Sequence, residues 1–265
     1  MEGRSERERR RGVFDEVAAL YDRARPGYPE GLFDDLVRSA ALEPGSRVIE
    51  IGPGTGQATR ALAERGLAVT AVELGSRLGA VARQNLAAFT AVEVVEADFE
   101  SWRPEAGGFD AVMAFTSFHW LDPATRYARA SAVLRPEGAL AVAITEHVWP
   151  EGGDSFFAEG QEDYLATTDV TDPSPPPPPE EVTGLAAEID ATGLFETISS
   201  MRYLWEATYD AEQYIAVIET YSGHLVWSAD MRRNLNERLR ARIDARPGGT
   251  IRKGYLTTLD VATKL

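Results

Sequence analysis

Residues 47–57 read RVIEIGPGTGQ, a β-branched run that meets three glycines at alternate positions. The run from 47 to 51 predicts a strand, because branched side chains pack well on a pleated surface. Helix-forming residues then continue from 57 to 65 and end at Gly66. A strand, a glycine turn and a helix in this order are typical of nucleotide-cofactor sites, where the backbone approaches the ligand closely and the helix N-terminus offers free N–H groups.

The same alternation continues along the chain. Strands alternating with helices predict βαβ units, and therefore an α/β fold with a doubly wound, Rossmann-like and mostly parallel sheet. We expect further strands at 68–73, 92–97, 109–115, 138–145, 197–209 and 250–263. We expect the other helices at 13–21, 32–40, 76–88, 124–134, 156–166, 182–192, 210–221 and 228–245.

Composition excludes several classes of protein. The 265 residues are 44% hydrophobic and contain no cysteine, which removes disulfides, thiolate metal sites and thiol nucleophiles. With three histidines, we expect no metal site. A net charge of −15 repels a nucleic-acid backbone, and no apolar run reaches the ~18 residues of a membrane span. The charged start lacks the apolar core of a secretory signal, so we expect a cytoplasmic protein without nucleic-acid or membrane partners.

We interpret the arginine-rich residues 1–12 as a flexible tail and 13–265 as one domain. Within this domain, 13–145 forms the core, 146–182 a loop with a proline-rich segment, and 210–245 a helical cap inserted between the last two strands. The segment at 173–179 holds five consecutive prolines, which predict extended polyproline II. We prefer a stiff surface connector to a peptide that a partner recognises in an aromatic groove.

The glycine loop differs from the dinucleotide-binding fingerprint. That fingerprint, G-x-G-x-x-G, needs a third glycine where Gln57 stands. Glu50 also places a carboxylate two residues before the first glycine. A carboxylate at this turn repels a pyrophosphate and attracts an ammonium or sulfonium group. The electrostatics therefore favour a cationic ligand.

The segment 50–56, EIGPGTG, resembles motif I of the class I S-adenosylmethionine-dependent methyltransferases. In that family, an acid placed like Glu73 hydrogen-bonds the ribose hydroxyls. An aspartate placed like Asp98 meets the adenine amino group, and the next side chain, here Phe99, packs near the ring. The resemblance covers residues 13–145 in order and implies S-adenosyl-L-methionine as cofactor.

Further segments extend the resemblance. FTSFHW at 115–120 stands at the family's motif IV, and LRPEG at 134–138 resembles its turn into strand five. YDRARPGYP at 21–29 resembles the N-terminal segment of small-molecule methyltransferases similar to trans-aconitate methyltransferase. The family closes its seven-stranded sheet with an antiparallel last strand, which we place at 250–263.

The resemblance implies a set of cofactor-binding residues. Aromatic rings over a sulfonium gain cation–π attraction, and an arginine can pair the cofactor's carboxylate. The expected cofactor-binding residues are Tyr21, Arg25, Glu50, Gly52, Pro53, Gly54, Gly56, Glu73, Leu74, Asp98, Phe99, Phe115 and Thr116.

His119 is the candidate catalytic residue. It follows a central strand at the edge where open α/β sheets bind ligands, so it could accept a proton from the acceptor or form a wall of the pocket. We prefer the wall, and interpret His224 as a packing or surface residue. The expected acceptor-binding residues are Tyr28, His119, Trp120, His147, Trp149 and Tyr221.

The leading hypothesis is methyl transfer to a small-molecule acceptor, such as a secondary metabolite, by a monomer or homodimer. One alternative is a protein of this fold that binds S-adenosylmethionine without methylating, as a regulator or as a cyclase or isomerase. Another is a nicotinamide-dependent oxidoreductase, which Gln57 and Glu50 disfavour. Aromatic residues after the core suggest an apolar or aromatic acceptor: Trp149, Phe156, Phe157, Tyr164, Tyr214, Tyr221 and Trp227.

Overall fold

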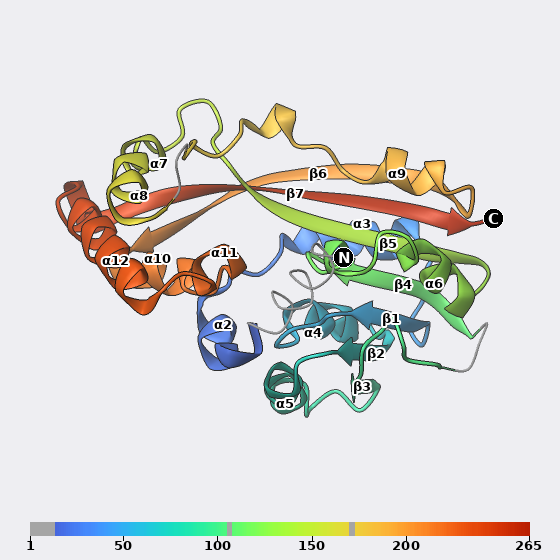
Figure 1. Ribbon diagram of the computed structural model, residues 1–265. Helices are drawn as coiled ribbons and strands as arrows, with labels where there is room; N and C mark the ends of the chain where they lie inside the picture. The colour runs from blue at the N-terminus through green and yellow to red at the C-terminus, as the bar shows by residue number, and fades with distance from the viewer. Residues whose placement is uncertain (1–13, 105–107, 170–172) are drawn as a thin grey trace.

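The computed structural model describes residues 14–104, 108–169 and 173–265, which fold around a seven-stranded sheet (Figure 1). The strand order is β3-β2-β1-β4-β5-β7-β6. Neighbours from β3 to β5 pair in parallel, and β7 is antiparallel to both β5 and β6. This confirms the predicted doubly wound sheet and its antiparallel last strand. The strands are β1 (Arg47–Ile51), β2 (Ala68–Glu73), β3 (Val92–Glu96), β4 (Phe109–Phe115), β5 (Leu134–Val148), β6 (Phe195–Asp210) and β7 (Thr250–Lys264).

The first strands match the sequence-based bounds, whereas β5 and β6 are longer. The LRPEG segment at 134–138, expected as a turn, belongs to β5, although the register against β4 shifts between Phe109 and Ala111. Glu137 takes a positive φ of 59° there. The start of β5 therefore pairs as a strand although its backbone turns at Glu137. The Pro-Glu-Gly sequence predicts the turn but not the pairing.

Helices cover both faces of the sheet. On one face, α3 and α4 bury Leu32, Leu36 and Leu62 against alternate residues of β1, β2 and β4. On the other face, α6 and α9 pack Tyr127 and Ile189 against the intervening residues. Central parallel strands are buried on both faces, and β1 and β4 are accordingly apolar except for Arg47 and Glu50 in β1 and Asp110 in β4. The helices are α2 (Ala18–Ala24), α3 (Glu30–Ser39), α4 (Gln57–Glu64), α5 (Ser76–Asn85), α6 (Arg126–Val133), α7 (Phe156–Glu159), α8 (Gln161–Thr167), α9 (Ala186–Ala191), α10 (Ala211–Ile218), α11 (Ser222–Leu225) and α12 (Ala229–Asp244).

Several helices differ from the sequence-based bounds. The helix expected at 156–166 divides at Gly160 into α7 and α8, so the segment 146–182 is more than a loop. The helix expected at 182–192 is restricted to α9, because residues 182–185 continue from the proline-rich segment. The predicted tail at 1–12 lies outside the described residues. Within the described ranges, no helix is both long and apolar enough to cross a membrane.

We call α7, α8, α10 and α12, with the adjoining ends of β6 and β7, the helical lobe. Figure 1 shows these helices gathered at one end of the molecule, where the long strands run past the rest of the sheet. The lobe has its own core, in which Phe156, Leu235 and Leu239 are fully buried near Tyr214 and Tyr255. The expected insertion at 210–245 is thus helical and packs with α8 rather than joining the sheet.

The start of α10 gives a test of the lobe's local stability. The Asp210 carboxylate accepts the Gln213 N–H at 2.8 Å, and the Gln213 side chain accepts the Asp210 N–H at 3.0 Å. Asp210→Ala leaves a helix N–H unpaired, and we expect unfolding to become easier by about 1 kcal/mol. Urea denaturation measures this loss. Glu212→Ala, at the second residue of the helix and outside the capping bonds, is the control, and an equal loss in both variants would contradict the capping role.

Candidate functional site

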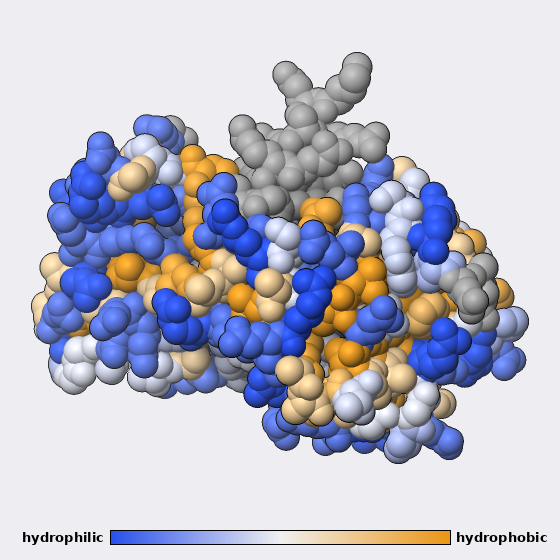
Figure 2. Space-filling view, turned by 90° about the horizontal axis from the view of Figure 1, so that it is seen from below, coloured by the Kyte–Doolittle hydropathy of each residue, from blue (hydrophilic) through white to orange (hydrophobic). Residues whose placement is uncertain are grey.

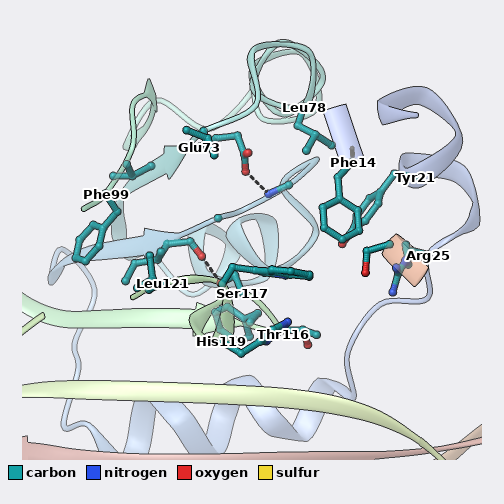
Figure 3. Close-up of a pocket in the computed structure, with 18 of the residues that line it drawn as sticks. Phe14, Tyr21, Arg25, Glu73, Leu78, Phe99, Thr116, Ser117, His119 and Leu121 are labelled. Carbon is teal, nitrogen blue, oxygen red and sulfur yellow. Dashed lines mark hydrogen bonds between the residues drawn. The ribbon is translucent and has the colours of Figure 1, made fainter. Parts of the chain in front are cut away.

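A cavity opens at the carboxyl ends of β1, β2 and β4, and we call it the first cavity. The strand order reverses between β1 and β4, which is where open α/β sheets bind ligands. Figure 3 shows Glu73 and Phe99 on one side and Phe14, Tyr21 and Arg25 on the other. Seen from below in Figure 2, apolar residues gather toward a hollow in a largely hydrophilic face. The lining residues are Phe14, Tyr21, Arg25, Ile51, Gly52, Gly54, Val72, Glu73, Leu74, Leu78, Ala97, Phe99, Phe115, Thr116, Ser117, His119, Trp120, Leu121, Tyr221 and Ser222.

The glycine loop has left-handed backbone at Gly52, Gly54 and Gly56, with φ of 64°, 60° and 88°. A Cβ on Gly52 would stand 2.9 Å from the Ser117 Cβ, so packing as well as conformation requires glycine there. A Cβ on Gly54 would meet Tyr21 at an ordinary 3.5 Å. Gly54 is therefore required by its backbone conformation and by the space that it leaves open in the cavity.

Glu73 holds the loop in place from the end of β2. One carboxylate oxygen accepts the Gly54 N–H at 2.9 Å (Figure 3). The other oxygen accepts the Gly75 N–H at 2.8 Å. Burial raises the pKa of Glu73, while these two hydrogen bonds oppose the rise. Each oxygen retains a further lone pair, so Glu73 can still accept hydrogen bonds from hydroxyl groups in the cavity.

Glu50 lies on β1 behind the loop rather than in the cavity wall. Its side chain is 1% exposed, and its Oε2 has no hydrogen-bond partner among the described residues. Burial, together with the negative charge of Glu73, raises the pKa of Glu50 to about 7. An unpaired buried carboxylate is costly, so its position beside the loop fits a ligand that brings positive charge.

Arg25 joins the N-terminal helix to the lobe. Its guanidinium donates to the Thr220 hydroxyl at 2.7 Å and to the Thr220 carbonyl at 2.9 Å. It also stands 4.6 Å from the ring centre of Tyr221 and 5.1 Å from that of Tyr21. These contacts place Arg25 and both tyrosines at one wall of the first cavity.

His119 lies in the 3₁₀ turn Phe118–Trp120 that follows β4, beside the Trp120 ring at 4.8 Å. One side of His119 is open to solvent, while the protein around its ring excludes enough water to lower its pKa. The positive charge of Arg126 lowers this pKa further. A neutral imidazole at the cavity edge is compatible with both a general base and a wall of the pocket.

Five expected site residues lie next to the first cavity instead of lining it: Tyr28, Glu50, Pro53, Gly56 and Asp98. The Tyr28 ring packs against Phe115 at 5.4 Å and its hydroxyl donates to Thr116 at 3.5 Å, so it supports the end of β4. Asp98 accepts the Glu100 N–H at 3.1 Å and stands between two lining residues.

A second cavity lies in the helical lobe. It contains His147, whereas Trp149 lines neither cavity. Six of the seven aromatic residues expected around an acceptor line this cavity. Tyr221 is the one described residue that lines both cavities. The second cavity is lined by His147, Phe156, Phe157, Gly160, Gln161, Tyr164, Pro173, Ser174, Pro176, Tyr214, Tyr221, His224, Trp227, Leu239 and Lys253.

Sequence reasoning missed Ser117 and Lys253. The Ser117 hydroxyl donates to the Ile51 carbonyl, which ties the end of β4 to the end of β1. Its position in the 115–120 segment was a signal for a cavity residue. The sequence did contain a signal for Lys253. The chain has only two lysines, and this one follows Arg252 and is followed by six uncharged residues of the expected last strand.

Comparisons with known proteins identify the domain around the first cavity. Residues 48–138 match the family described as "Methyltransferase domain". Over 131 residues, the chain is 37% identical to an uncharacterized methyltransferase of Mycobacterium tuberculosis strain H37Rv, which covers 48% of this chain and 49% of the relative. Over 167 residues, it is 31% identical to malonyl-[acyl-carrier protein] O-methyltransferase of Geobacter sulfurreducens, covering 61% and 59%.

Solved structures share the fold. A putative type II methyltransferase from Anaeromyxobacter dehalogenans has a TM-score of 0.61 at 20% identity, and covers 89% of this chain and 97% of that protein. A phosphoethanolamine N-methyltransferase from Haemonchus contortus has a TM-score of 0.52 at 17% identity, and covers 94% and 57%. The chain spans about half the length of the curated relatives that it matches first. Together, these matches and the sheet support a class I S-adenosylmethionine-dependent methyltransferase, because residues 48–138 match a methyltransferase domain and the sheet has the fold of solved methyltransferases.

Proposed function

We propose that the protein transfers a methyl group from S-adenosylmethionine to a small-molecule acceptor. The observation that carries this proposal is the buried Glu50 carboxylate, whose Oε2 has no hydrogen-bond partner among the described residues, behind a glycine loop at the switch point of a methyltransferase fold. When bound, S-adenosylmethionine supplies a methyl group on positively charged sulfur. A buried negative charge stabilises such a cation more than it would stabilise a phosphate.

The residues of the first cavity fit the parts of this cofactor. Glu73 has lone pairs left for ribose hydroxyls, and Leu74 and Phe99 offer apolar surface for adenine. The loop at Gly52 and Gly54 leaves space for the methionine end. These assignments rest on the family resemblance together with the cavity geometry.

The contribution of the chain to catalysis is alignment and exclusion of water. Phe14 and Trp120 approach one another edge-to-face at 5.6 Å across the rim of the cavity and shield it. In a displacement at carbon, binding holds the two reacting atoms in line. This lowers the activation free energy, because most of their translational and rotational entropy has already been lost on binding. We infer a small-molecule acceptor from the cavities and not from the solved structures. The Haemonchus contortus enzyme, which was solved with a small phosphorylated amine, shares only its fold with this chain. The resemblance to the trans-aconitate methyltransferase subgroup stays a prediction.

Gly54→Val tests the cofactor site. We expect S-adenosylhomocysteine binding, measured by calorimetry, to fall at least a hundredfold because the side chain enters the space beside Tyr21. Gly193→Val is the matched control, since Gly193 has a similar φ of 65° with open space around it, at a turn outside both cavities. Both variants lose on the order of 1–2 kcal/mol of stability through left-handed backbone. Equal affinity in the two folded variants would refute the site.

Glu50→Gln tests the charge behind the loop. With a pKa of about 7 in the free protein, Glu50 is partly protonated at neutral pH. A cationic ligand lowers that pKa, so we expect wild-type protein to release protons on binding S-adenosylmethionine at pH 7, and the Gln variant to release fewer. Calorimetry in buffers of different ionisation enthalpy measures this release, and equal proton release in both proteins would contradict the assignment.

The same substitution has a predicted effect on stability. Because the pKa of Glu50 is raised in the folded protein, the stability that it contributes is present below pH ~4.5 and is lost as pH rises through about 7. At pH 8, Glu50→Gln therefore removes a penalty of up to ~3 kcal/mol and raises the melting temperature, although it weakens cofactor binding.

His119→Asn separates a wall from a general base. We expect the variant to raise the acceptor's KM and to keep kcat within about tenfold, as the loss of uniform binding does. Because the pKa of His119 lies below its ordinary value, we also expect kcat to stay level between pH 8 and 7. A loss of ~10²–10⁴ in kcat with unchanged KM would instead identify a base. These measurements need one identified acceptor.

A further inference from the structure

The second cavity has a volume of about 360 Å³ and contains an unusual cation. The chain has 27 basic residues, of which only Lys253 and Lys264 are lysines. Lys253 is fully buried, and its ammonium donates to the Tyr221 hydroxyl at 2.7 Å. Its nitrogen also lies 4.9 Å from the ring centre of Tyr221 and 5.2 Å from that of Tyr255.

No carboxylate of the described residues forms an ion pair with Lys253. Other cations in the lobe have such partners: Arg242 donates to Asp163 at 2.6 Å, and Arg246 pairs with Asp154. Aromatic rings offset part of the cost of burying Lys253, and its hydrogen-bond partner is the Tyr221 hydroxyl. Although burial opposes it, the positive charges of Lys253 and Arg25 lower the pKa of that hydroxyl. Burial accordingly lowers the pKa of Lys253.

Two neutral imidazoles face the same space. The His147 Nε2 is buried without a partner among the described residues, and its ring lies 4.5 Å from that of Phe157. The His224 Nε2 approaches the Tyr164 hydroxyl at 3.4 Å. Burial and the positive charge of Lys253 lower the pKa of both histidines, to about 2 for His147 and about 4 for His224. Neutral imidazoles can donate a hydrogen bond here, and no described group accepts one from His147.

The walls of the cavity are flat and apolar. Phe156, Phe157, Tyr164, Tyr214 and Trp227 line it, and their rings meet one another edge-to-face. Such surfaces suit the faces and edges of another aromatic ring. A single buried ammonium among them favours one negative charge over several, because each further charge would be buried without a partner.

Tyr221 connects this cavity to the first one. Arg25 stands over its ring on the side of the first cavity, while Lys253 bonds its hydroxyl on the side of the second. A molecule in the second cavity therefore lies against a residue that also lines the cavity that the proposed function assigns to the cofactor.

We propose that the second cavity binds the acceptor as an aromatic carboxylic acid with one negative charge, its carboxylate held by the Lys253 ammonium and the His147 ring N–H. The ring of the acid packs among the aromatic residues of the lobe. This inference rests on the proposed function for the acceptor role, but the binding itself does not require turnover.

The two lysines make a direct measurement possible. In protein labelled with ¹⁵N-lysine and saturated with S-adenosylhomocysteine, the side-chain nitrogens give two signals, which Lys253→Met assigns. We expect 2-naphthoate to move the Lys253 signal and to leave the Lys264 signal in place, since Lys264 bonds the carbonyls of Ser131 and Leu134 far along β7. Neutral 2-naphthamide and the non-aromatic tricarboxylate tricarballylate should cause at least tenfold weaker effects.

Calorimetry with variants completes the test. Lys253→Met should weaken 2-naphthoate binding at least tenfold and leave the affinity for S-adenosylhomocysteine unchanged, while Lys264→Met should change neither. If Lys253→Met does not fold, Tyr221→Phe keeps the ammonium and frees one of its N–H groups, so naphthoate binding should be retained or tightened. An unmoved Lys253 signal at millimolar naphthoate, or equal binding of the amide, would overturn the inference. If wild-type protein does not bind S-adenosylhomocysteine, the proposed function is overturned instead. The naphthoate measurement would still show whether the second cavity binds an aromatic carboxylic acid.

Discussion

The carboxylate of Glu73 is the contact on which the first cavity depends. It bonds the Gly54 N–H with one oxygen and the Gly75 N–H with the other, and so joins the loops that follow β1 and β2. Without it, two partly buried backbone donors at the carboxyl ends of β1 and β2 would lose their hydrogen-bond partner. The left-handed glycines then follow as a consequence, because the loop must turn sharply to present the Gly54 N–H to β2.

The central sheet and the glycine loop could be predicted from sequence because their signals are local. The bounds of β1, β2 and β4 follow from short buried runs that end at glycine or polar residues. The bounds of β6 and β7 were also expected to within two residues, but their pairing with each other could not be predicted, because it joins segments that are forty or more residues apart. The second cavity has the same origin: α8 and α12 must pack together before Lys253 and His147 face one space. The sequence identified the aromatic residues of this cavity as a group, but it did not show that they surround Lys253.

Glu50 and Lys253 are two buried charges of opposite sign, one beside each cavity. Burial shifts the pKa of each toward its neutral form, so both destabilise the fold when they are ionised. Such costs persist where a ligand compensates them. A cationic cofactor beside Glu50 and an anionic acceptor beside Lys253 would each relieve one penalty, and the two ligands would attract one another across Tyr221. The two proposals together would account for charged residues at both positions, where apolar ones would be more stable.

The wall between the cavities also makes the lobe part of the catalytic domain. Arg25 bonds both the hydroxyl and the carbonyl of Thr220, so the residue before Tyr221 is fixed to the N-terminal helix. Lys253 fixes the other side of Tyr221 to β7, a strand that pairs with β5 in the sheet. The orientation of the Tyr221 ring is therefore set by the segment after α10, by Arg25 at the end of α2 and by Lys253 of β7, which are distant in sequence. Because in-line displacement is sensitive to sub-ångström alignment, in the proposed reaction these bonds would hold the acceptor side of the site in register with the glycine loop.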